Sequence, residues 1–198
     1  MKAPAKSMAI VLYLGGNIKE YEEKSAGIIR GAIDGGQFRC ELCLRPMGRH
    51  SSYTRGIRET GEKLEITMVW CRGCRNFHSL QPDFLLPHKH YSGNEIEGVI
   101  IDSATEASAI LIETKASEST VRRWVKQIGG RIRHAVGKLK YLFGREGRAV
   151  SEVAIDAGAP YDELEQVLDM APSPVKCSGN KLGLANIWLG TSGAPAYI

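Results

Sequence analysis

Residues 40–43 read Cys-Glu-Leu-Cys and residues 71–74 read Cys-Arg-Gly-Cys, so two Cys-x-x-Cys pairs are separated by 27 residues. Each pair places two thiolates on one tight turn, and two such turns can bring four sulfurs to the tetrahedral corners that Zn²⁺ prefers. Because all four positions are cysteine, no coordination position stays open, which is typical of a structural site. We therefore predict Zn²⁺ bound by Cys40, Cys43, Cys71 and Cys74, with iron in the same ligand set as the main alternative.

The residues between the two pairs have the pattern of a β-hairpin. Tyr53, Arg55 and Ile57 alternate with other residues before a Thr60-Gly61 turn. Apolar residues alternate after that turn, at Leu64, Ile66, Met68 and Trp70. An isolated hairpin is marginally stable in water, and metal binding would supply the missing folding energy. We expect a small zinc β-ribbon over residues 37–80.

Composition and cysteine use restrict the class of protein. The chain has 198 residues, of which 43% are hydrophobic and 24% charged, as in a folded domain. No apolar run approaches the roughly 20 residues of a membrane span, and residues 1–16 do not resemble a signal peptide. We expect a cytoplasmic protein, in which paired cysteines more often bind metal than form disulfides. Two redox motifs are the alternative, but neither pair begins a helix after a strand. Cys177 is predicted to be a free thiol.

A helix-turn-helix is predicted after a proline-bounded linker over residues 81–93. Val121, Trp124 and Ile128 form one apolar stripe, and the opposite face presents polar and basic residues, namely Ser119, Arg122, Arg123 and Lys126. A preceding helix is expected over residues 105–114, with only a short turn between the two. In such a motif the second helix enters the major groove of DNA. We assign the whole module to residues 94–128.

Positive charge is concentrated in this part of the chain. Residues 119–148 contain nine Lys or Arg and one acid, Glu146, a local charge of +8, although the whole chain carries only +4. Such a concentration is typical of a phosphate-binding region. A helical hairpin with a solvated basic face is the plainer alternative. A further basic helix over residues 131–144, after a break at Gly129-Gly130, is compatible with DNA-backbone contact, a homodimer interface or an amphipathic surface helix.

The order of these motifs resembles a known group of proteins. The stretches Cys71-Arg-Gly-Cys74-Arg-Asn-Phe77, Pro82-Asp-Phe84-Leu-Leu-Pro87 and Ser117-Glu-Ser-Thr-Val-Arg-Arg-Trp124 are similar to zinc-ribbon plus helix-turn-helix proteins found in bacterial transposases or as stand-alone proteins of mobile elements. The resemblance implies DNA contact from five residues, Ser119, Thr120, Arg122, Arg123 and Lys126. It also implies double-stranded DNA, and a transposase or other recombination protein, as partners. Lys115 stands where such proteins usually have Gly.

No active site is evident in the sequence. The acidic residues Asp162, Glu163, Glu165 and Asp169 fall on a short helix expected over residues 160–170, and we interpret them as a solvated face. The remaining segments are a strand and helix over residues 1–36, basic and C-terminal helices over 129–170, and an irregular tail over 171–198.

The fold class is therefore predicted as α+β, a small zinc β-ribbon followed by a helical DNA-binding domain. We expect a sequence-specific, nucleoid-associated DNA-binding protein, not an enzyme. Arg45, Arg49, Arg55 and Arg58 of the ribbon would add backbone contacts. The alternative function is a zinc-ribbon adaptor that recruits a protein such as a transposase or polymerase.

Overall fold

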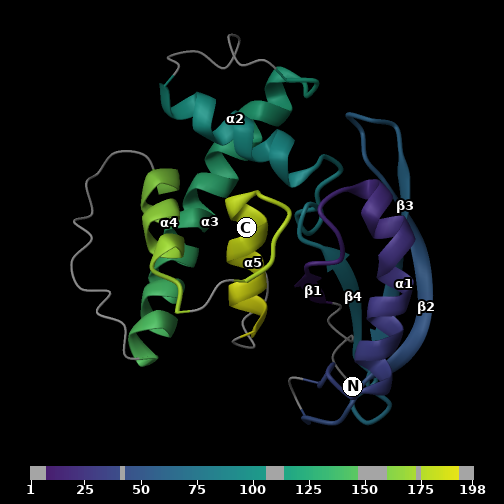
Figure 1. Cartoon of the computed structure of the whole chain (residues 1–198). Helices are drawn as coiled ribbons and strands as arrows, with labels where there is room; N and C mark the ends of the chain where they lie inside the picture. The colour runs from purple at the N-terminus through teal and green to yellow at the C-terminus, as the bar shows by residue number, and fades with distance from the viewer. Residues whose placement is uncertain (1–7, 41–42, 106–113, 147–159, 173–174, 192–198) are drawn as a thin grey trace, which may run out of the picture.

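The computed structural model describes residues 8–40, 43–105, 114–146, 160–172 and 175–191. They form β1 (Met8–Leu12), α1 (Ile18–Asp34), β2 (Gly48–Gly56), β3 (Lys63–Trp70), β4 (Phe77–Pro82), α2 (Gly93–Thr105), α3 (Glu118–Arg145), α4 (Pro160–Asp169) and α5 (Lys181–Thr191). The strands and α1 make one half of the molecule and the other four helices make the second half (Figure 1). The α+β class is confirmed. Every helix of this described part is too short or too polar to cross a lipid bilayer.

The four strands form one mixed sheet in the order β1-β4-β3-β2. β2 and β3 make the predicted antiparallel hairpin, whose connection contains Gly61 at a φ of 75°. β3 also pairs antiparallel with β4, and β4 pairs parallel with β1. The sequence pattern does not predict β4, because nearly all of it is buried and it therefore lacks the polar–apolar alternation of a half-exposed strand. The N-terminal strand and the hairpin thus belong to the same sheet.

The N-terminal helix α1 covers the sheet. Asn17 accepts a hydrogen bond from the Glu20 N–H (3.0 Å) and so caps the helix, as an N-cap side chain does. On its inner face Tyr21 donates from its hydroxyl to the Glu65 carbonyl of β3 (2.7 Å). The Tyr21 ring also meets Phe84 edge to face, with 6.1 Å between ring centroids. These contacts hold α1 against the hairpin that separates the two cysteine pairs.

The long helix α3 corrects the predicted break at Gly129-Gly130, because it runs without interruption from Glu118 to Arg145. Two interior glycines together cost a helix about 2 kcal/mol relative to alanine. The apolar stripe continues in phase across them, and Ile128 and Ile132 are both fully buried. Burying two such side chains contributes about 3–6 kcal/mol, which exceeds the cost of the glycines.

Helix α5 corrects the prediction of an irregular tail over residues 171–198. Leu182, Ala185 and Leu189 are fully buried, and Trp188 is 9% exposed. The helix lies between α3 and β1 (Figure 1) and is covered on most sides, so its sequence shows no amphipathic period. Asn180 directly precedes it and accepts a hydrogen bond from the Gly183 N–H (2.5 Å).

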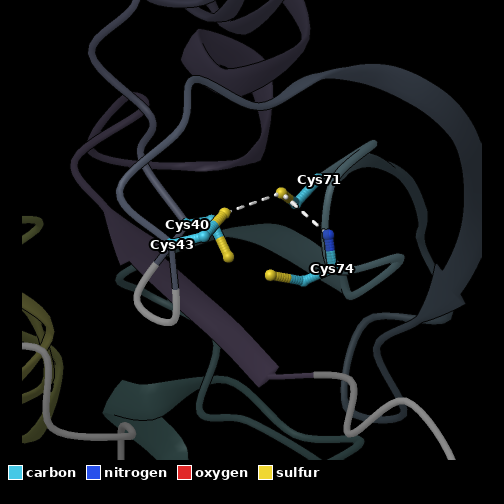
Figure 2. A group of neighbouring side chains, drawn as sticks. All are labelled: Cys40, Cys43, Cys71 and Cys74. Atoms are coloured by element: carbon cyan, nitrogen blue, oxygen red, sulfur yellow. Dashed lines mark hydrogen bonds between the residues drawn. The ribbon is translucent and has the colours of Figure 1, made fainter.

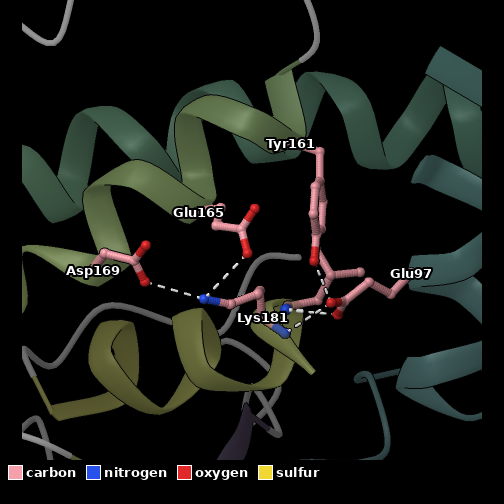
Figure 3. A network of polar contacts seen from close by, with 6 residues as sticks. Glu97, Tyr161, Glu165, Asp169 and Lys181 are labelled. Atoms are coloured by element: carbon pink, nitrogen blue, oxygen red, sulfur yellow. Dashed lines mark hydrogen bonds and ion pairs between the residues drawn. The ribbon is translucent and has the colours of Figure 1, made fainter. Parts of the chain in front are cut away.

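The buried carboxylate of Glu97, in α2, ties three helices together (Figure 3). It accepts hydrogen bonds from the Lys181 N–H (3.0 Å) and the Leu182 N–H (3.2 Å) at the start of α5, and from the Tyr161 hydroxyl of α4. A negative charge is favourable at a helix N-terminus. Burial, followed by the hydrogen bond to Glu97, raises the pKa of Tyr161, so its hydroxyl stays a donor.

The acidic face of α4 is only partly solvated, contrary to the prediction. Lys181 forms ion pairs with Asp169 (3.1 Å) and Glu165 (3.4 Å), whose side chains are at least half exposed (Figure 3). Glu163 is only 15% exposed and pairs with Lys140 of α3 at 2.6 Å. These carboxylates therefore join helices to one another.

A second buried carboxylate, Asp83, joins the sheet half to the helical half. Its Oδ2 accepts hydrogen bonds from the N–H (2.6 Å) and hydroxyl (2.9 Å) of Ser178. Its backbone carbonyl accepts from the Asn180 amide (3.4 Å) and lies so close to Gly183 that a Cβ there would overlap it. Burial raises the pKa of Asp83, and the hydrogen bonds from Ser178 oppose that shift.

Candidate metal centre and basic surface

The described residues of the two cysteine pairs share two backbone features. The Leu44 N–H donates to the Cys40 carbonyl (2.8 Å), and the Arg75 N–H donates to the Cys71 carbonyl (2.7 Å). In each turn the residue after the second cysteine is left-handed, Leu44 at a φ of 57° and Arg75 at 59°. A non-glycine residue in this region costs about 1–3 kcal/mol and persists where the surroundings impose it. A left-handed residue thus follows each pair, and the two sulfurs of each pair lie at a common centre.

The four sulfurs converge between these turns (Figure 2). All four Sγ atoms lie within 4.8 Å of one another, and those of Cys43 and Cys71 are 3.4 Å apart. Sulfurs bound at about 2.3 Å to a tetrahedral zinc ion would be about 3.8 Å apart, so the cluster fits such an ion. Cys40 and Cys71 are buried, and Cys43 and Cys74 are half-buried. The prediction that these cysteines come together is confirmed, and the cluster can hold a metal ion such as zinc.

The thiols influence one another's protonation. A backbone hydrogen bond from Arg45, reinforced by hydrogen bonds with neighbouring thiols, lowers the pKa of Cys43 to about 7. The hydrogen bond with Cys43, together with burial and the nearby sulfurs, raises the pKa of Cys74 to about 12. The Cys43 thiol therefore loses its proton more readily than the Cys74 thiol. A divalent cation at the centre would favour the thiolate form of all four, which is the form that binds metal.

The remaining candidate ligands lie apart from this cluster. His78, four residues after Cys74, is not part of it. His78 is only 2% exposed, and neither of its ring nitrogens has a hydrogen-bond partner among the described residues. Burial lowers the pKa of His78, which favours the neutral ring. Cys177 also stays outside the cluster as a free thiol.

The predicted DNA-contacting residues all lie on the first turns of α3. Val121, Trp124 and Ile128 are buried, as the apolar stripe predicts. On the other side of the helix Ser119, Arg122, Arg123 and Lys126 are exposed, and Thr120 is half-buried. The helix expected over residues 105–114 falls mostly on residues 106–113, outside the described part of the chain. The second member of the predicted helix-turn-helix is thus a helix, and the motif as a whole stays a prediction.

Arg55 corrects one detail of the predicted DNA surface. Its side chain is 7% exposed, and its guanidinium donates to the Gln81 side chain (2.6 Å), the Leu86 carbonyl (2.6 Å) and the Lys89 carbonyl. Arg55 therefore holds the linker against the sheet, and its buried guanidinium is not accessible to DNA. Arg58, by contrast, is exposed at the end of the hairpin.

The linker contributes basic residues that sequence reasoning misses. His88, Lys89 and His90 line a hollow of about 420 Å³ together with Arg58 and Arg123. In the sequence these residues are visible only as a His-Lys-His run, which we interpret as part of the extended linker. Only the fold places this run beside the first turns of α3.

One comparison with known families matches the region from the first cysteine to α3. A family model described as "Domain of unknown function (DUF6431)" matches residues 40–124, which include both cysteine pairs, the linker, α2 and the first turns of α3. No curated protein and no solved structure shows significant similarity to the chain.

Proposed function

We propose that this chain is a sequence-specific DNA-binding protein in which a structural zinc ribbon supports a helix-turn-helix. The observation that carries the proposal is the exposed basic face of α3, with Arg122, Arg123 and Lys126 opposite a buried apolar stripe. A helix anchored in this way presents a rigid set of side chains that fits the major groove. The local charge of +8 over residues 119–148 would favour association with DNA phosphates.

In this proposal zinc has a structural role. Cys40, Cys43, Cys71 and Cys74 would hold it, and it would supply folding energy to the sheet half. The sheet carries the linker that leads to the helical half, and Arg55 fixes that linker through the Leu86 carbonyl (2.6 Å). The ribbon would thereby set the position of α3 on DNA, while exposed ribbon residues such as Arg45, Arg49 and Arg58 add backbone contacts.

The proposed biological setting follows from the sequence resemblance. The cysteine pairs, the Phe-Leu-Leu-Pro linker and the Ser-rich start of α3 are similar to proteins of transposons and other mobile elements. We therefore place the protein on the nucleoid, with a transposase or another recombination protein as a further partner.

The decisive experiment is a salt titration of DNA binding with a double variant. Replacing Arg123→Ala and Lys126→Ala should weaken binding to duplex DNA at least tenfold and reduce the slope of log K against log salt by about 2, because each lost phosphate contact removes about 0.9 from the slope. Fluorescence anisotropy with labelled random and genomic duplexes provides both quantities.

A matched control separates the face of α3 from net charge. Lys19→Ala with Arg30→Ala removes one Lys and one Arg from exposed positions of α1. This control should bind DNA almost as tightly as the unmodified protein. Equal affinity and equal slope for the two double variants would reject the assignment of α3 as the DNA-contacting helix.

The second candidate is a zinc-ribbon adaptor that recruits a transposase or polymerase. A stacked aromatic pair favours it: Trp70 and Phe77 are half-buried with centroids 6.0 Å apart, and His50 meets Phe77 at 4.8 Å. Such a surface suits protein contact. The adaptor predicts no binding to duplex DNA even at low salt, which the same titration measures.

A further inference from the structure

The hollow between the linker and α3 is lined by basic side chains from three separate segments. Arg58 comes from the end of the hairpin, His88, Lys89 and His90 from the linker, and Thr120 and Arg123 from α3. Its volume is about 420 Å³, and no carboxylate is among the described residues that line it. Segments far apart in the sequence thus bring cations together at one point on the surface.

The linker side of the hollow is rigidly held. The buried Arg55 guanidinium binds the carbonyls of Leu86 (2.6 Å) and Lys89, and the Arg58 N–H donates to the His90 carbonyl (2.7 Å). These backbone carbonyls of the linker therefore accept hydrogen bonds from within the protein, while His88, Lys89 and His90 line the hollow.

Aromatic packing fixes the linker against α3. Tyr91, at the end of the linker, meets Trp124 edge to face with 4.9 Å between ring centroids. Both residues are buried. This contact sets the position of Lys89 relative to Arg123 before any ligand arrives, which reduces the cost of ordering these side chains on binding.

The cations in this region lack the partners that neutralise similar residues nearby. Arg122 forms an ion pair with Glu118 at 2.5 Å, whereas Arg123, Lys89 and Arg58 form none with any residue that the structure describes. Burial lowers the pKa of Lys89, and the positive charges of Arg131 and Arg123 lower it further. Cations held close together against their mutual repulsion favour an anionic ligand.

We propose that this hollow binds a phosphate group of the DNA backbone, with Lys89, Arg58 and Arg123 as its principal contacts and the Thr120 hydroxyl as a further donor. The inference rests on the proposed DNA-binding function and adds the linker to the interface. Ser119 and Lys126 lie on the same first turns of α3, so a duplex that contacts them would bring its backbone to the hollow. Phosphate contacts of this kind fix the orientation of a helix in the groove.

The test is a salt titration of duplex DNA binding with Arg58→Ala and Lys89→Ala combined, each residue lying outside the predicted recognition face. We expect a loss of affinity of about tenfold at low salt and a reduction of the salt slope by about 1–2, as for the loss of one or two phosphate contacts. Lys89→Arg keeps the charge and should retain most of the affinity, while Lys89→Gln should not.

One control and two possible outcomes distinguish failure of the phosphate site from failure of the proposed function. Zinc content and thermal unfolding equal to those of the unmodified protein show that a variant is folded. If the unmodified protein binds DNA, and the Arg58/Lys89 variant binds as tightly and with the same slope as Lys19→Ala with Arg30→Ala, the phosphate site is refuted while the proposed function stands. If the unmodified protein does not bind duplex DNA at low salt, the function and the site are both refuted.

Discussion

The two halves of this molecule build their cores in different ways. The core of the sheet half includes Cys40 and Cys71, which are buried and belong to the sulfur cluster, so the candidate metal centre is part of that core. The core of the helical half is formed by hydrophobic side chains such as Trp124 and Phe143, and its buried Glu97 carboxylate is hydrogen-bonded within the protein. We therefore expect the stability of the sheet half to depend on a metal ion, whereas the helical half is stabilised mainly by apolar burial.

Removing the metal should have the largest effect and should act on one half only. Chelation, or Cys71→Ser, is expected to unfold the sheet half, because structural zinc contributes an apparent free energy of about 10–16 kcal/mol in small zinc domains. Tryptophan fluorescence can follow the halves separately after single substitutions, since Trp70 lies in β3 and Trp124 and Trp188 in helices of the other half. The emission of Trp70 should change most, while helical circular dichroism is largely retained.

The lone cysteine offers a matched control for this experiment. Cys177→Ser removes a thiol outside the sulfur cluster and should leave metal content and stability unchanged. Identical unfolding curves with and without chelator would contradict the dependence of the sheet half on metal.

The connection between the halves can be broken at one glycine. Gly183→Ala should destabilise the protein by about 1–3 kcal/mol, because its Cβ would overlap the Asp83 carbonyl and lie 2.7 Å from the Asn180 Oδ1. Chemical denaturation measures the free energy of unfolding. The two halves should then also unfold less cooperatively.

Gly190→Ala is the control for that substitution, since it lies on the same helix α5 with open space around its Cβ. It should be neutral or stabilising by up to about 1 kcal/mol. Equal effects of the two substitutions would show that the contact between Gly183 and Asp83 does not join the halves.

The smallest expected effect tests the continuity of α3 in the helical half. Gly130→Ala should stabilise the protein by about 0.5–1 kcal/mol, since Gly130 is exposed and helical, and a methyl group added to its Cα would meet nothing within 4 Å. Gly130→Pro should instead destabilise it by about 3 kcal/mol. A tolerated proline together with no gain from alanine would favour two separate helices, and thermal unfolding distinguishes the cases.

The sequence predicted those elements whose residue types and spacing are sufficient to identify them. The Cys-x-x-Cys pairs predicted the sulfur cluster, and alternation around Thr60-Gly61 predicted the hairpin. The stripe of Val121, Trp124 and Ile128 predicted the buried side of α3. Each of these depends on residues a few positions apart, or on a metal-binding chemistry that allows few alternatives.

Elements buried on several sides escaped prediction. β4 and α5 show no clear period because neighbouring elements cover them on more than one face. The glycines of α3 indicate a break when considered locally, because the burial of Ile128 and Ile132 that compensates them comes from distant helices. Such outcomes depend on the sum of many contacts rather than on local preference.

By itself the sequence determined the cluster of four cysteines, the amphipathic start of α3 and the concentration of positive charge, because residue type and spacing are sufficient for each. Only the tertiary structure decided that β1 joins the hairpin's sheet, that Asp83 and Gly183 meet, and that Lys89 lies beside Arg123. These are contacts between residues far apart in the chain. Such contacts stabilise the protein only once the two cores have formed, so no local sequence pattern predicts them.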